Sequence, residues 1–267
     1  MSGPLFVRTV AANAVRMVLA AAGLMLMGAL MPIVFAAFGQ EVGAFVERVP
    51  LLSQLAQFGG GNLFTLNGAI SLAFLHPFTL LLLGIMAIGF PALAIAGERE
   101  GGTLEVLLAR PIARRGLYAT LYLAGLVFLG VLLAALLAAA VVSTNAVGLG
   151  DELDALKLVQ LGLAGWLLFV AIMSLTFAVS IMSDRLAPAI GIPLVFVLLN
   201  YLAYAIGSIW PDAAWLEDWS IFSLVKAQDI LSGGVAVSDV LVLLTLSAAL
   251  VAFAWLAFPR RDIAAHG

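Results

Sequence analysis

The residues of this chain that could do chemistry or bind a partner gather in one short segment, residues 97–115. The segment reads GEREGGTLEVLLARPIARR and carries three glutamates and four arginines. Charge is sparse elsewhere, because only 10% of the 267 residues are charged. This segment is therefore the strongest candidate for a functional site.

The local pattern predicts a short helix inside this segment. Gly101–Gly102 allow a sharp turn, and Thr103 can cap a helix that begins after it. Pro111 ends that helix, because the residue before a proline avoids the helical region. The helix would have one apolar face, made of Leu104, Leu107 and Leu108. An ordinary loop explains neither this spacing nor the glutamates, which are disfavoured beside an anionic membrane surface and so suggest a protein partner.

Motifs that would give the chain an enzymatic activity of its own are absent from the sequence. It has no cysteine and only two histidines, His76 and His266, so no metal site and no catalytic residue is expected. His76 precedes Pro77 and reads as a polar residue at a helix start. No G-x-x-x-x-G-K-[ST] loop is present, and the only lysines are Lys157 and Lys226. The chain therefore cannot bind ATP through such a loop.

The composition predicts a membrane protein. Hydrophobic residues make up 64% of the chain, while soluble domains carry about 25% charged residues. Six apolar stretches are long enough to cross a bilayer as helices: residues 17–38, 77–97, 117–142, 158–182, 188–209 and 240–258. We expect a single transmembrane domain over residues 1–267, all-α, with six spans.

The distribution of Lys and Arg predicts both termini in the cytoplasm, with the chain in the inner (plasma) membrane. Six spans would place nine of the 12 basic residues on one side: Arg8, Arg16, Arg99, Arg110, Arg114, Arg115, Arg185, Arg260 and Arg261. The other three are Arg48, Lys157 and Lys226. Positive residues favour the inner side. The net charge of −3 provides no basic excess for nucleic acid.

Two outer segments, residues 39–76 and 210–239, are long enough to hold short interfacial helices. Residues 49–58 have apolar side chains at helical spacing. Residues 222–231 could form a second short helix, closed by Gly233–Gly234. Three tryptophans in the second outer segment suit an interfacial belt: Trp210, Trp215 and Trp219.

The predicted spans contain no ionisable side chain. Their polar residues are neutral and suit hydrogen bonds between helices or to the local backbone: Ser174, Thr176, Ser180, Asn200, Thr245 and Ser247. Ion-coupled carriers and proton pumps usually need an ionisable group at membrane depth. The sequence therefore argues against an ion-coupled carrier.

The charged segment resembles the coupling region of the ABC type-2 permease family, the six-helix membrane subunits of ABC exporters. That family has the pattern A-G-E-x-E-x-G-T-L-E-x-L-L-x-x-P-[IVL]-x-R between its second and third spans. Residues 96–114 read AGEREGGTLEVLLARPIAR. Residues 74–77, 222–234 and 258–262 are also similar to the family, so the resemblance extends over nearly the whole chain. It departs at Ala113–Arg115, where members often have a Ser/Arg pair.

The resemblance implies a permease that couples ATP hydrolysis by a cytoplasmic ABC ATPase subunit to solute movement. A second permease subunit, in a homodimer or heterodimer, would face this one in the lipid bilayer. The chain would need no cofactor, since ATP and Mg²⁺ would bind to the ATPase. The implied docking residues are Glu98, Arg99, Glu100, Gly101, Gly102, Thr103, Leu104, Glu105, Leu107, Leu108, Arg110 and Pro111.

One alternative of another class stays open. The chain could be a membrane scaffold or assembly factor that docks a cytoplasmic partner and transports nothing. Its spans would be uncharged too, so composition does not separate the two functions. The sequence also does not identify a substrate, although uncharged spans are compatible with an apolar or amphipathic solute.

Overall fold

The computed structural model describes residues 3–46, 64–102 and 113–260, and every regular element in these ranges is a helix. Six helices or helical runs are long and apolar enough to cross a membrane. They are α1 (Gly3–Val46), the run from α4 to α6 (Pro77–Glu100), α8 (Arg114–Ala146), α9 (Ala155–Met182), α10 (Leu186–Ile209) and α13 (Val237–Arg260). Each predicted span lies within one of these helices. The predicted all-helical chain with six spans is confirmed.

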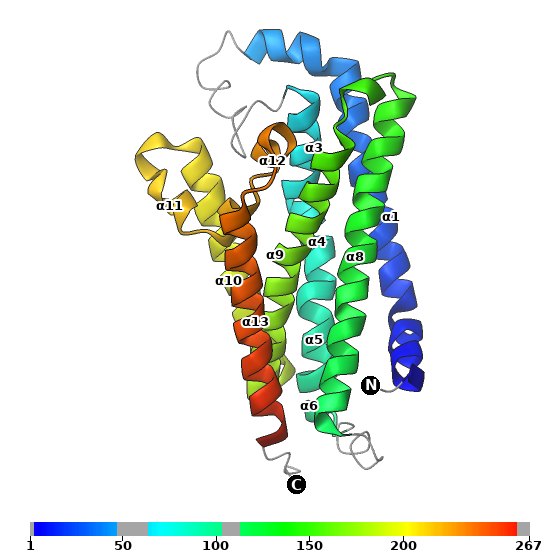
Figure 1. Cartoon of the computed structure of the whole chain (residues 1–267), viewed down its shortest axis with the longest axis vertical. Helices are drawn as coiled ribbons and strands as arrows, with labels where there is room; N and C mark the ends of the chain where they lie inside the picture. Colours follow the sequence, from blue (N-terminus) through cyan, green and yellow to red (C-terminus); the bar gives the residue numbers. More distant parts are fainter. Residues whose placement is uncertain (1–2, 47–63, 103–112, 261–267) are drawn as a thin grey trace.

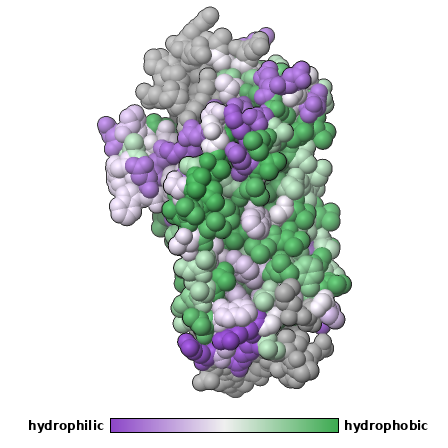
Figure 2. All heavy atoms as spheres, in the orientation of Figure 1, coloured by the Kyte–Doolittle hydropathy of each residue, from purple (hydrophilic) through white to green (hydrophobic). Residues whose placement is uncertain are grey.

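The face of the bundle drawn in Figure 2 is hydrophobic along its middle, with polar residues toward its two ends. Among the apolar residues of the spans, Leu81 of the second span and Leu199 of α10 (Leu186–Ile209) are 60% and 61% exposed. So much exposed apolar surface is unusual in a soluble monomer and fits contact with lipid. Figure 1 shows both chain termini at one end of the bundle. We call this the terminal end and the opposite one the distal end.

The helix α9 forms the centre of the bundle. In the most apolar stretch of α9, 72% of the residues are buried, compared with 17% in each of α10 and α13. Phe177 of α9 meets Phe90 edge-to-face, with ring centroids 6.4 Å apart, and Phe90 meets Phe128 of α8 in the same way at 5.2 Å. The core therefore lies between α8, α9 and the second span, while α10 and α13 lie at the periphery (Figure 1).

The spans differ in length, and the excess lies at the distal end. The helices α10 and α13 have 24 residues each, whereas α8 has 33 and α1 has 44. At about 1.5 Å per residue, these lengths correspond to about 36, 50 and 66 Å. The distal parts of α1 and α8 thus extend beyond the shorter spans, and the short helices α3 and α12 lie at this level (Figure 1).

The helix α3 (Leu66–Leu75) was not predicted, because ten residues are too few to cross a membrane. Eight of its ten residues are buried. It ends at His76, whose extended backbone is the conformation favoured before a proline. Nδ1 of His76 then accepts the N–H of Phe78 at 3.2 Å and caps α4 (Pro77–Gly84). His76 is thus the predicted polar residue at a helix start. The interfacial helix predicted at residues 49–58 lies outside the described ranges.

The connection between α10 and α13 contains four short elements: η4 (Pro211–Ala213), α11 (Trp215–Asp218), η5 (Ile221–Val225) and α12 (Ala227–Gly233). The single helix predicted at residues 222–231 is divided, because Lys226 has an extended backbone between η5 and α12. Gly234 follows α12 with a φ of 93°. Asn200 of α10 anchors the connection: its Oδ1 accepts the N–H of Ile221 at 3.0 Å, and its carbonyl accepts the Ser220 hydroxyl at 2.7 Å.

The helices α1 and α8 approach each other closely at Gly28. A Cβ atom at this position would lie 2.1 Å from the carbonyl oxygen of Leu136. Small residues at such crossings are typical of membrane helices, which pack through close backbone approach. The position therefore requires glycine.

We expect Gly28→Ala to push α1 away from α8 and to lower the free energy of unfolding by about 1–3 kcal/mol, as overpacking does in other cores. Gly84→Ala is the matched control, because open space surrounds that helical glycine and alanine is the better helix former. Thermal unfolding in a fixed detergent, followed by tryptophan fluorescence, measures both variants. Equal melting temperatures for Gly28→Ala and the parent chain would contradict the close crossing.

Candidate functional site

The predicted docking residues begin at the terminal end, where the second span stops. Glu98, Arg99 and Glu100 form the short helix α6, and Gly101 and Gly102 make the turn after it. Gly102 has a φ of 68°, a conformation that favours glycine. The other predicted docking residues lie outside the described ranges: Thr103, Leu104, Glu105, Leu107, Leu108, Arg110 and Pro111.

Arg99 points inward, toward the end of α9. Its Nη1 donates to the carbonyl oxygens of Ile181 at 3.1 Å and Ser183 at 2.6 Å, and it lies 3.7 Å from Oδ1 of Asp184. Only 10% of the Arg99 side chain is exposed. The last carbonyls of a helix have no donor within the helix, and a charged donor makes a strong hydrogen bond to them. Arg99 therefore supplies the partner that the end of α9 lacks.

Glu100 makes the equivalent contact with the start of α10. Its Oε2 accepts the N–H of Leu186 at 2.7 Å. Leu186 is the first residue of α10, and the preceding residue, Arg185, makes no side-chain cap. A carboxylate at this position accepts an otherwise unpaired N–H and interacts favourably with the positive end of the helix dipole. A residue of the second span thus caps α10.

These contacts join the second span to the turn between α9 and α10. We call this arrangement the junction, made of Arg99, Glu100, Ser183, Asp184 and Leu186. The sequence predicts a docking role for Arg99 and Glu100 and does not predict their partners within the chain. The only signal for such contacts is that the turn from α9 to α10 is too short to cap both helices itself.

Ser180 makes a second contact between α9 and the second span, closer to the middle of the membrane. Its Oγ accepts the N–H of Ala96 at 3.1 Å and donates to the carbonyl of Pro91 at 3.2 Å. Ser180 is fully buried. Ala96 also packs with Ala92 and with Ala189 of α10. The neutral polar residue predicted to bond between helices does so here, and three helices meet at this level.

The start of α8 is fastened to the end of α13. Nη1 of Arg114 donates to the carbonyl of Pro259 at 3.5 Å. The guanidinium of Arg115 lies 5.7 Å from the ring centroid of Trp255, within the range of a cation–π contact. Both flanks of residues 103–112 are therefore tied to neighbouring spans: the second span to α9 and α10, and α8 to α13.

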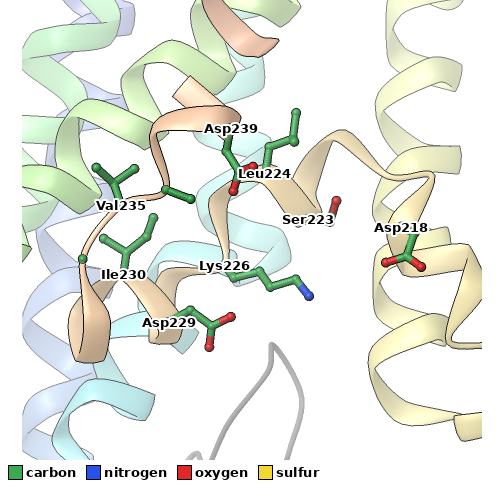
Figure 3. A pocket seen from close by; sticks show the side chains of 10 residues that line it. Asp218, Ser223, Leu224, Lys226, Asp229, Ile230, Val235 and Asp239 are labelled. Atoms are coloured by element: carbon green, nitrogen blue, oxygen red, sulfur yellow. The ribbon is translucent and has the colours of Figure 1, made fainter. Parts of the chain in front are cut away.

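A cavity of about 360 Å³ lies at the distal end, where the α10–α13 connection meets α13 (Figure 3). Its charged lining residues are Asp218, Lys226, Asp229 and Asp239. Nζ of Lys226 lies 2.7 Å from Oε1 of Glu217. Burial lowers the pKa of Lys226, but the hydrogen bond and charge of Glu217, together with nearby aspartates, outweigh it and raise the pKa. Lys226 is thus a fixed cation beside the cavity.

The junction connects helices, and its described residues do not form a metal site. In the described ranges, no group of three or more His, Cys, Asp or Glu side chains is placed to hold a metal ion. The junction instead links one helix tip to two other helices through charged hydrogen bonds. Its arrangement suits the transmission of movement between segments.

We expect Arg99→Leu to loosen the turn between α9 and α10. The carbonyls of Ile181 and Ser183 would lose a charged donor, and such a hydrogen bond contributes about 1.5–3 kcal/mol. Arg185 in this turn is exposed, so trypsin should cleave after it several times faster in the variant.

Mass spectrometry of the purified chain during limited trypsin digestion measures this cleavage. Arg8→Leu, at an exposed position of α1, is the control and should leave the rate at Arg185 unchanged. Identical rates in Arg99→Leu and the parent would show that Arg99 does not hold the turn.

Comparison with known families agrees with this architecture. The family model described as ABC-2 family transporter protein matches residues 8–263, which is nearly the whole chain and includes the junction. No curated protein shows a significant match to the sequence. With six membrane-spanning helices and a match of this extent, the chain belongs to the ABC-2 transporter family and is a multi-pass membrane component of an ABC transporter.

Proposed function

We propose that this chain is the permease subunit of an ATP-driven exporter and that a separate cytoplasmic ATPase subunit drives it. Family membership supports the permease role. The observation that carries the coupling role is the junction, because residues 103–112 leave the second span directly after side chains that hold α9 and α10. A force applied to residues 103–112 would reach those helices through Arg99 and Glu100.

The terminal end faces the cytoplasm in this proposal, and the membrane is the inner (plasma) membrane. Arginines gather at the terminal end, as the positive-inside rule requires of a cytoplasmic face: Arg8, Arg16, Arg99, Arg114, Arg115, Arg185 and Arg260. The basic residues described at the distal end are Lys157 and Lys226. The ATPase would therefore meet the terminal end, where the second span ends and α8 begins.

Residues 103–112 form the docking segment in this proposal. Its leucines would fill a groove of the ATPase, and Glu98 and Glu105 would meet basic residues there. ATP and Mg²⁺ would bind to the ATPase alone. A second permease subunit would complete the transporter, and the largely exposed helices α10 and α13 offer it apolar surface. The uncharged spans favour an apolar or amphipathic solute.

The coupling step follows from the contacts. Closure of the ATPase subunits on ATP would displace the docking segment and the tip of the second span with it. Arg99 would carry this displacement to the end of α9, and Glu100 to the start of α10. Because helices move as rigid bodies, a shift of the turn between α9 and α10 would reorient both spans.

The first test is capture of the ATPase. Leu104→Asp combined with Leu107→Asp should abolish co-purification of a soluble ABC ATPase with the chain, because two charges would enter the apolar docking face. The matched control is Val106→Asp combined with Ala109→Asp, which adds the same charge on the opposite face of the same predicted helix. Affinity purification from host membranes measures both, and an intact complex in the leucine variant would place docking elsewhere.

Reconstitution separates the permease from the scaffold alternative. The purified chain alone should hydrolyse no ATP, and the complex with its ATPase should show hydrolysis that responds to a solute and drives its flux. Hydrolysis that no solute changes, without flux, would instead identify a membrane scaffold.

A further inference from the structure

The second span contains two π-helical turns. They are η1 (Ile85–Gly89) and η2 (Leu93–Gly97), separated by α5 (Phe90–Ala92). Within them the N–H of Phe90 bonds to the carbonyl of Ile85, and the N–H of Glu98 to the carbonyl of Leu93, each five residues back. A π turn holds one more residue than an α turn, and such turns are frequent at functional sites.

The first π turn has a cause within its own helix. Pro91 has no N–H to donate, so the regular ladder of the span is interrupted one turn before it. The wider turn at Ile85–Gly89 accommodates this interruption.

The second π turn has a cause in another helix. In an α-helix the N–H of Ala96 would bond to the carbonyl of Ala92. Here that N–H donates to the Ser180 hydroxyl at 3.1 Å, and the hydroxyl in turn donates to the carbonyl of Pro91 at 3.2 Å. A side chain inserted into the backbone ladder is a recognised cause of helix distortion. The Ser180 hydroxyl thus bridges the N–H of Ala96 and the carbonyl of Pro91 within the backbone hydrogen-bond pattern of the second span.

The position of Ser180 distinguishes it from the other small polar residues of α9. Thr176 donates to the carbonyl of Ile172 and Ser174 to that of Val170, both four residues back in α9, and the Ser174 hydroxyl also shares a hydrogen bond with the Tyr122 hydroxyl of α8 at 2.8 Å. The Ser180 hydroxyl instead reaches two carbonyls of the second span, Pro91 at 3.2 Å and Ala92 at 3.5 Å. These are the acceptors that the Ala96 N–H would use in the π and α registers, respectively.

We propose that Ser180 is a positioning residue that holds the π register at Leu93–Gly97. It thereby sets the rotation at which the tip of the second span, Glu98–Gly102, delivers the docking segment to the ATPase. This inference rests on the proposed function and adds Ser180 as the residue that sets the orientation of the docking segment. Loss of one residue from the register rotates everything beyond it by about 100°. At a side-chain radius of about 5.5 Å, that rotation moves a side chain by about 8 Å.

The chain has no cysteine, so the rotation can be measured with two introduced spin labels. One replaces Gly101 at the exposed tip of the second span, and the other replaces Val15 on α1, which is 72% exposed. The full-length chain is reconstituted in lipid nanodiscs with an excess of unlabelled chain, so that distances within one molecule dominate. Pulsed electron paramagnetic resonance then gives the distance between the labels.

Ser180→Ala should shift this distance by several ångströms, up to about 8 Å, because the N–H of Ala96 would return to the carbonyl of Ala92. Ser180→Thr retains the hydroxyl and should keep the parental distance. Thr176→Val is the matched control, since it removes a buried hydroxyl of α9 that bonds only within α9, and it should also keep the parental distance.

Ser180→Gly is a second variant, because it also removes the hydroxyl that the Ala96 N–H donates to. It keeps the inference testable if Ser180→Ala does not fold. An unchanged distance in Ser180→Ala, or in Ser180→Gly if Ser180→Ala does not fold, would overturn the inference, as would an equal shift in Thr176→Val. The distance between the labels is measured without the ATPase. The inference can therefore be contradicted while the chain still captures its ATPase, and it can hold even if the chain captures none.

Discussion

A backbone N–H or C=O inside a membrane has no water to bond to, so each must find its partner within the protein. The terminal end of this protein meets that constraint by exchange between helices. Carbonyl oxygens at the end of α9 accept hydrogen bonds from Arg99, and the first N–H of α10 donates to Glu100. Ser180 accepts a backbone N–H of the second span at the point where its helical hydrogen-bond pattern is interrupted. Side chains of the second span thus form hydrogen bonds with backbone groups at the ends of α9 and α10. In return, Ser180 of α9 forms hydrogen bonds with backbone groups of the second span.

This exchange makes the terminal ends of three helices mechanically dependent on one another. Opening the junction would break the charged hydrogen bonds of Arg99, whose side chain is only 10% exposed, and hydrogen bonds to charged groups are among the more costly to lose. The small side chains of Ala92, Ala96 and Ala189 bring the same helices into close contact deeper in the membrane. The distal end follows the same rule, since Asn200 caps the connection that returns from α10. In the proposed mechanism, a segment attached to the tip of the second span would therefore act on α9 and α10 together.

The sequence predicted what hydrophobic length determines. The six spans could be predicted from apolar stretches of sufficient length. The turn at Gly101–Gly102 could be predicted from the conformational freedom of glycine. The sequence did not predict α3, because a buried helix of ten residues resembles part of a loop when its neighbours are unknown. It also missed the partners of Arg99 and Glu100, and for Ser180 it predicted a hydrogen bond between helices or to the local backbone without identifying the partner. Their partners lie more than 80 residues away along the chain, and no local pattern encodes which helix end a side chain will cap.

The central claim is that the docking segment moves α9 and α10 through Arg99 and Glu100. An environment-sensitive fluorophore on a cysteine introduced at Arg185, the exposed residue of the α9–α10 turn, reports that movement in the complex reconstituted with its ATPase. The account predicts a fluorescence change on ATP addition, and loss of most of that change in Arg99→Leu while ATP hydrolysis continues. An identical change in the parent and in Arg99→Leu, or none in the parent during active hydrolysis, would contradict it.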